Sequence, residues 1–138
     1  MSWSKEQETA IHTHGKNILV AAAAGSGKTA VLVERIIQLI LNNNVDISEI
    51  LVVTFTNAAA SEMRERIGRQ LEGHLSQAAQ HNDADMMKKL ERQLVLLNAA
   101  SISTLHAFCQ NILRRHFHEI DIDPKFRLAG EQETTLLK

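Results

Sequence analysis

The sequence has 138 residues, and its 15 Lys and Arg nearly balance its 16 Asp and Glu. That length supports one domain with one core, and the charge balance excludes a purely electrostatic nucleic-acid binder while allowing a local nucleic-acid site. The single cysteine, Cys109, excludes an internal disulfide, and no apolar run approaches the ~20 residues that span a bilayer. These features predict a cytoplasmic protein without contact to a membrane.

The first part of the chain alternates helical and strand patterns. Ser4 and Gln7 have the spacing of a capping box, which starts a helix. Short apolar runs predict buried strands, and an apolar stripe at helical spacing predicts a helix between them. In chain order, we expect a helix over about residues 5–12, a strand over 17–21, a helix over 29–42 and a strand over 50–55.

The remaining chain is mainly helical in pattern. Gly68 and Gly73 each weaken a long helix by about 1 kcal/mol relative to Ala. Cys109 lies on the apolar side of its helix, so we expect it in the core. The expected elements are helices over 57–80, 84–98 and 104–118, strands over 100–103 and 126–128, and a helix from residue 131. The alternation of strands and helices predicts an α/β fold with a parallel sheet and flanking helices.

A Gly-rich segment, Ala21 to Thr29 (AAAAGSGKT), lies between the first expected strand and the next helix. Small residues let backbone N–H groups converge on phosphate oxygens, and a helix N-terminus favours anions. Lys28 supplies a charge for the β- and γ-phosphates, and the Thr29 hydroxyl suits Mg²⁺. Ala22 stands where the general P-loop pattern has Gly, so an ordinary Gly-rich turn is the alternative. The segment predicts binding of a nucleoside triphosphate, ATP in the first place.

Two further motifs follow expected strands: TFTNAAASEM at residues 54–63 and STLHAF at residues 103–108. With Gln7 and residues 22–29, they resemble superfamily 1 helicases of the UvrD/Rep type, which tolerate Ala at the first P-loop position. The all-alanine entry to the P-loop and the LHAFC segment look most like the AddA branch of bacterial helicase–nucleases. The resemblance covers nearly the whole chain.

The resemblance implies a P-loop NTPase (RecA-like) parallel sheet, incomplete here, with its core over residues 1–60 and about 99–120. Residues 61–98 would form a helical insertion. It implies a 3′–5′ DNA helicase and exonuclease that uses ATP and Mg²⁺ in double-strand break repair and recombination. The implied partners are single- and double-stranded DNA and a second, AddB-like subunit.

The resemblance also implies a nucleotide site. Gln7 matches a glutamine that reads adenine, for which an amide offers a donor and an acceptor; a helix-capping role is the alternative. Arg35 matches an arginine near the base, and a solvated helix position is the alternative. The implied ATP-binding residues are Gln7, Ala22, Ala23, Ala24, Gly25, Ser26, Gly27, Lys28, Thr29 and Arg35, with Thr29 also a Mg²⁺ ligand.

The same resemblance implies a single-stranded DNA site beyond the strand ends, where parallel sheets bind ligands. Phe55 would stack on or pack against a base, or else end the strand in the core. His106 would contact DNA, or else be a structural histidine, and Leu105 stands where the family often has an aromatic residue. The implied DNA-binding residues are Phe55, Thr56, Asn57, Thr104 and His106.

No expected strand ends in the acidic pair that would hold Mg²⁺ for hydrolysis; residues 119–123 are too short and acidic for a buried strand. We therefore expect an N-terminal part of a longer helicase chain that does not hydrolyse ATP alone. The histidines lack zinc spacing, and the basic cluster at residues 114–116 suits a solvated helix end. The remaining alternatives are a small P-loop kinase and a non-enzymatic nucleotide-binding module.

Overall fold

The structure is a computed structural model that describes residues 3–21, 23, 25–123 and 125–127. It divides into two compact units, Met1–Thr104 and Leu105–Lys138. The predicted P-loop residues Ala22 and Ala24 and the expected helix from residue 131 lie outside the described residues.

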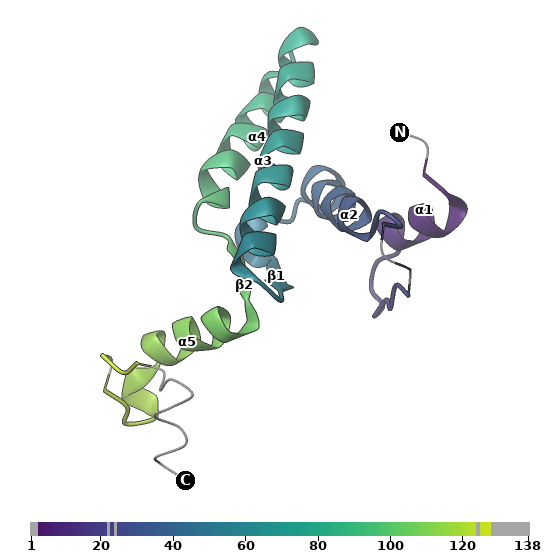
Figure 1. Cartoon of the computed structure of the whole chain (residues 1–138). Helices are drawn as coiled ribbons and strands as arrows, with labels where there is room; N and C mark the ends of the chain where they lie inside the picture. Colours follow the sequence, from purple (N-terminus) through teal and green to yellow (C-terminus); the bar gives the residue numbers. More distant parts are fainter. Residues whose placement is uncertain (1–2, 22, 24, 124, 128–138) are drawn as a thin grey trace. The chain divides into compact units, whose positions relative to one another are not determined.

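A short parallel sheet lies in the first unit (Figure 1). Strand β1 (Leu51–Thr54) pairs with β2 (Ser101–Thr104), and the register sets Thr54 opposite Thr104. Two helices, α3 (Asn57–Gln80) and α4 (Ala84–Leu97), form the connection between the strands. The predicted α/β class, with a parallel sheet and flanking helices, is therefore confirmed for the described residues.

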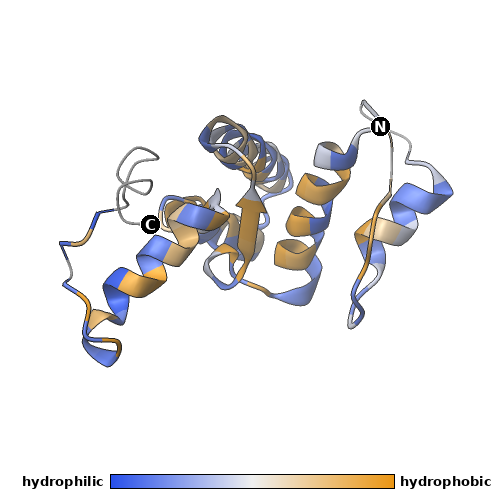
Figure 2. Cartoon of the chain, turned by 60° about the horizontal axis from the view of Figure 1, so that its bottom comes forward, coloured by the Kyte–Doolittle hydropathy of each residue, from blue (hydrophilic) through white to orange (hydrophobic). Residues whose placement is uncertain are grey.

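Only one face of β1 is buried. Val52 and its partner Ile102 are buried in the core with residues of α3, whereas Leu51 and Val53 are 47% and 44% exposed. Side chains alternate between the two faces of a strand. The prediction that this strand is buried is therefore correct for Val52 and wrong for its neighbours Leu51 and Val53. The apolar character of β1 is visible in Figure 2, where it is the orange strand.

The strand expected over residues 17–21 is not formed. Residues 17–20 have no regular secondary structure, and the side chain of Leu19 is 95% exposed. A strand needs a neighbour for its N–H and C=O groups, and in the described sheet β1 and β2 pair only with each other. The strand expected at residues 126–128 is also not formed at 126 and 127, which are irregular.

The predicted helices of the first unit are confirmed. Helix α1 spans Lys5–His12, α2 spans Lys28–Asn43, and a 3₁₀ turn, η1 (Ile47–Glu49), leads from α2 towards β1. The predicted break between α3 and α4 is present at residues 81–83. The core of this unit joins the apolar faces of α2, α3 and α4 to the sheet and includes Ile36, Ile37, Ile40, Met63, Ile67, Leu71 and Leu90.

The second unit contains helix α5 (Leu105–Arg115) and a 3₁₀ turn, η2 (Phe117–Glu119). The helix ends earlier than expected, and the turn follows it. None of its residues is buried, so the prediction that Cys109 belongs to a core is wrong and the thiol is exposed. The helices among the described residues are too short or too polar to cross a membrane.

Candidate functional site

The Gly-rich loop enters α2 through two glycines in the left-handed region. Gly25 has φ 79° and Gly27, the N-cap of α2, has φ 80°, conformations that strain any L-residue with a side chain. The Ser26 N–H donates to the Ala23 carbonyl at 3.3 Å and closes a turn. No side chain caps α2, so the first turn of the helix offers its N–H groups at an exposed loop, which favours an anion.

Lys28 folds back across this loop. Its Nζ donates to the Ala23 carbonyl oxygen at 2.6 Å, which places the ammonium group at the mouth of the turn. Thr29 follows in the first turn of α2, and both side chains are exposed. A cation and helical N–H groups, which suit phosphate oxygens, are thus gathered at one helix end with a hydroxyl oxygen, which suits Mg²⁺.

Gln7 connects α1 to this loop. Its Oε1 accepts a hydrogen bond from Ser4 N at 2.9 Å, which completes the capping box, and its Nε2 donates to the Ser26 carbonyl at 3.4 Å. The capping role is therefore confirmed, and the same carboxamide also contacts the Gly-rich loop. Beside it, hydrogen bonds from its own backbone N–H and from the Ser4 hydroxyl hold the pKa of the exposed Glu6 carboxyl below its usual value.

Arg35 fastens α1 to α2. Its Nη1 donates to the carbonyl oxygens of Ala10 at 2.6 Å and Ile11 at 3.3 Å. Ala10 and Ile11 also pack on Val31 of α2 in a small apolar cluster. Arg35 is half-buried, so the alternative of a solvated position is wrong, and its guanidinium contacts a helix C-terminus. This attachment determines where Gln7 lies relative to the loop.

The predicted DNA residues follow the ends of the two paired strands. Phe55 is fully exposed, so the alternative that it ends the strand in the core is wrong. The Thr56 hydroxyl accepts a hydrogen bond from Ala59 N at 3.1 Å and caps α3, whose first residue is the exposed Asn57. Thr104 ends β2 opposite Thr54, so the parallel register brings the two strand ends together. An exposed aromatic ring at a strand end can stack on a base.

His106 lies in the first turn of α5, which belongs to the second unit. Its side chain is exposed, and so is Leu105, which is 55% exposed. The histidine is therefore not a buried structural residue. Strand pairing brings Thr104 next to Thr54 at the end of β1, whereas His106 lies on the following helix, α5.

Sequence reasoning missed two polar residues on apolar helix faces. Arg64 of α3 donates to three backbone carbonyl oxygens around the start of β2. Gln93 of α4 is 2% exposed and bridges Asp46 and Ile47. Both follow the helical spacing of apolar neighbours: Arg64 lies three residues before Ile67, and Gln93 three after Leu90. A polar residue within an apolar stripe was the available signal.

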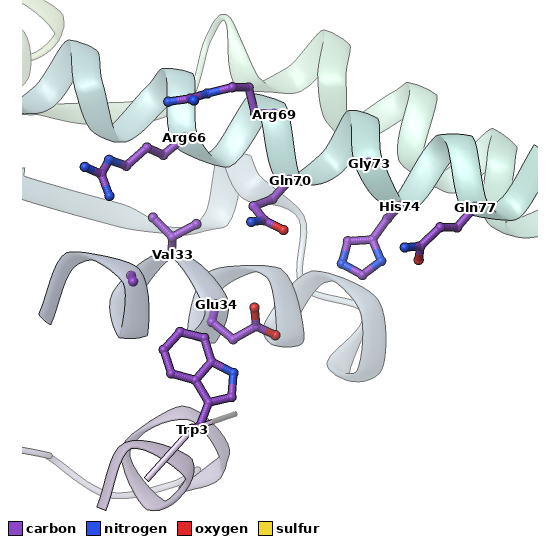
Figure 3. Close-up of a pocket in the computed structure, with 10 residues that line it drawn as sticks. Trp3, Val33, Glu34, Arg66, Arg69, Gln70, Gly73, His74 and Gln77 are labelled. Carbon is purple, nitrogen blue, oxygen red and sulfur yellow. The ribbon is translucent and has the colours of Figure 1, made fainter. Parts of the chain in front are cut away.

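A cleft of about 730 Å³ lies along α2 and α3, with Trp3 at one side (Figure 3). It runs from Ala30, next to Thr29, towards His74 and Gln77. Its wall carries Arg66, whose guanidinium pairs with Glu62 at 2.6 Å and is therefore already neutralised. Figure 3 shows Glu34 on α2, on the side of Trp3, and Arg66 and Arg69 on α3, so the lining of the cleft carries charges of both signs.

Comparison with known proteins places these sites in context. The profile of the family "UvrD/REP helicase N-terminal domain" matches residues 3–138. The chain is 57% identical over 140 residues to an ATP-dependent helicase/nuclease subunit of Clostridium novyi (strain NT), covering 100% of this chain and 11% of that protein. The proteins of the same description from Alkaliphilus oremlandii (strain OhILAs) and Syntrophomonas wolfei are 55% and 54% identical, with 99% of this chain and 11% and 10% of theirs covered. The chain thus spans about a tenth of the length of these relatives.

Proposed function

The chain belongs to the UvrD/REP helicase N-terminal domain family, and from this premise we propose that it is the ATP-binding part of the first motor domain of an AddA-type helicase/nuclease. Its fold would be an incomplete RecA-like P-loop sheet, with α3 and α4 as the helical insertion. The parent protein would be a 3′–5′ DNA helicase and exonuclease in double-strand break repair. It would be cytoplasmic and would assemble with a second, AddB-like subunit.

The observation that carries this proposal is the loop at the N-terminus of α2. Gly25 and Gly27 adopt the left-handed conformations that let a backbone wrap around phosphates. Lys28 lies at the mouth of the loop. Gln7 is already in contact with the loop through Ser26, so a base-reading amide and a phosphate cradle lie next to each other. An ordinary Gly-rich turn would have no need for this contact.

Each group then has a task. Lys28 exchanges its bond to Ala23 for the β- and γ-phosphates, and the backbone N–H groups of residues 25–29 receive the phosphate oxygens. Ala22, Ala23 and Ala24 would form the entry to the phosphate site. The Thr29 hydroxyl would hold Mg²⁺, and the ion would supply charge neutralisation at the phosphates. Gln7 reads the adenine edge, and Arg35 lies near the base while it keeps α1 in place.

The paired strand ends would hold single-stranded DNA. Phe55 stacks on a base, Thr56 and Asn57 contact phosphates, and Thr104 and His106 add the contacts of the second strand end. Both β1 and β2 end in Thr, so neither supplies the acidic group that hydrolysis needs. The chain alone would therefore bind ATP with Mg²⁺ and not turn it over.

Nucleotide titrations of the 138-residue chain test the proposal. Trp3 packs on the small cluster between α1 and α2, so its fluorescence reports on this region, with calorimetry as a second readout. We expect ATP with Mg²⁺ to bind more tightly than GTP. Lys28→Ala should abolish binding without loss of helicity, whereas Lys16→Ala, an exposed lysine outside the P-loop, should bind as the wild type does.

Gln7→Glu tests base reading separately. Glutamate is also found at this capping-box position, so α1 is retained, but the amide donor is lost. We expect the preference for ATP over GTP to disappear while both still bind. Binding that ignores Lys28→Ala would refute the P-loop assignment. Phosphoryl transfer to a small acceptor would favour a kinase, and nucleotide binding without any DNA binding would favour a non-enzymatic module.

A further inference from the structure

We propose that Arg64 is a positioning residue of the DNA site: it holds β2 so that Thr104 stays beside Thr54. The proposal rests on the proposed DNA-binding function of these strand ends. Arg64 itself lies in the second turn of α3, seven residues after Asn57, and is half-buried. It would act on DNA only through the backbone that it contacts.

The guanidinium binds three carbonyl groups that are close together in the chain. Its Nη1 donates to the Leu97 carbonyl, and its Nη2 donates at 3.2 Å to both Ala100 and Ile102. Leu97 is the last residue of α4, and Ile102 lies in β2. One side chain therefore spans the whole connection from the end of α4 into the strand.

Two of these three carbonyl groups also accept a backbone N–H group: Ala100 N donates to Leu97 O at 3.3 Å, and Ile102 N donates to Ala100 O at 2.8 Å. Leu97, Ala100 and Ile102 are all buried, at 7%, 6% and 4% exposure, so their carbonyl groups have little access to water. A carbonyl oxygen has two lone pairs, so Arg64 adds a second donor at Leu97 and Ala100, where water has little access. A planar, permanently charged fork can serve several carbonyls at once and interacts favourably with a helix C-terminus.

Helix α3, which carries Arg64, begins directly after Phe55 and Thr56, the proposed DNA-binding residues that follow β1. Thr56 caps α3 directly after Phe55, so α3 is fixed at its start to one strand end. Arg64 then fixes the following turns of α3 to the other strand. The parallel ladder pairs only four residues on each strand, Leu51–Thr54 with Ser101–Thr104. So short a ladder depends on neighbouring contacts for its register, and Arg64 supplies one.

The test uses Arg64→Lys and Arg64→Met in the 138-residue chain, with Arg69→Met as the matched control. Arg69 lies on the same helix, and its ion pair with Glu65 is exposed on both sides, so its removal changes the net charge equally without touching β2. Lysine keeps the charge of Arg64 but offers a single point donor in place of the fork. Amide hydrogen exchange by NMR and binding of an oligo-dT are the two readouts, with ATP binding as reference.

We expect the amides of β2 to exchange faster in both Arg64 variants, while those of α2 keep their protection. Oligo-dT should bind about tenfold more weakly, the factor that corresponds to 1.4 kcal/mol, with unchanged ATP affinity. Arg69→Met should match the wild type in amide exchange, and its loss of oligo-dT affinity should be smaller than that of Arg64→Met, because it removes the same charge without touching β2. Equal loss of protection in α2 and β2 would mean a purely structural role and would overturn the proposal, as would unchanged exchange in β2.

The two readouts separate this proposal from the proposed function. If the wild type binds ATP but not oligo-dT, the DNA role of the strand ends is refuted and the proposal falls with it. If the wild type binds both and Arg64→Lys binds oligo-dT with wild-type affinity, only the positioning role of Arg64 is refuted.

Discussion

Substitution of Gln93 by leucine gives the sharpest test of what holds β1 in place. Gln93 is almost completely buried between α4 and the turn that leads to β1. Its Nε2 donates to Asp46 Oδ1 at 2.6 Å, and its Oε1 accepts from Ile47 N at 2.8 Å. Leucine has a similar volume, so the variant removes two hydrogen bonds without opening a large cavity.

The loss of stability in Gln93→Leu follows from the two groups that lose a hydrogen-bond partner, the Ile47 N–H and the Asp46 carboxylate. Ile47 is fully buried, so its N–H would lose its partner without access to water, at about 1–3 kcal/mol. Asp46 keeps the Arg92 guanidinium at 2.5 Å, so the second lost bond adds only about 1 kcal/mol. We expect Gln93→Leu to destabilise the chain by about 2–4 kcal/mol, a fall in Tm of about 10 °C.

Urea unfolding followed by circular dichroism measures this change. Gln77→Leu, the same substitution at an exposed position of α3, should stay within about 0.5 kcal/mol of the wild type. Arg92→Ala removes an ion pair whose arginine is 66% exposed and should cost less than about 1 kcal/mol. If Gln93→Leu is as stable as Gln77→Leu, the buried amide does not stabilise the turn, and the reasoning fails.

Two further predictions concern α3 and the loop before it. A Cβ at Gly73 would meet nothing within 4 Å, so Gly73→Ala should stabilise the chain by up to about 1 kcal/mol. At Gly68 a Cβ would lie 3.4 Å from Leu97 Cδ2, so Gly68→Ala should gain less; equal gains in urea unfolding would contradict this packing argument. Phe55→Ala should weaken binding of oligo-dT by roughly 1–3 kcal/mol without changing stability, because the ring is fully exposed. Val95→Ala, at a 72% exposed apolar position on α4, should change neither; equal DNA affinity of the Phe55 variant would exclude stacking.

The helices could be predicted because their signals are local. The capping box at Ser4 and Gln7 and the apolar stripe of α2 specify a helix within a few turns of chain. The run at residues 17–21 carried an equally clear apolar signal and did not form a strand among the described residues. A strand depends on a partner elsewhere, which no local pattern reports.

The candidate site was predicted in part for the same reason. The glycines and Lys28 follow a motif of fixed spacing, and the structure gives Gly25 and Gly27 left-handed conformations that glycine favours, while nucleotide binding by this loop stays a prediction. The contacts of Arg35 and Arg64 with distant carbonyl groups could not be predicted, because they depend on how helices pack. A charged residue within an apolar stripe indicates such a contact, although it does not identify the acceptor.

One core connects the two proposed sites. Helix α2 begins at the proposed P-loop, and its residues Ile36 and Ile37 belong to the same buried cluster as Met63 and Ile67 of α3. Close-packed side chains cannot move independently, so a shift of α2 when the loop closes on phosphates would be opposed or followed by α3. Helix α3 starts at the Phe55 loop and reaches β2 through Arg64. Nucleotide-dependent DNA affinity in this chain would therefore require both the α2–α3 contact and the Arg64 contact. With only one of these contacts, one of the two strand ends would not follow the movement of α2.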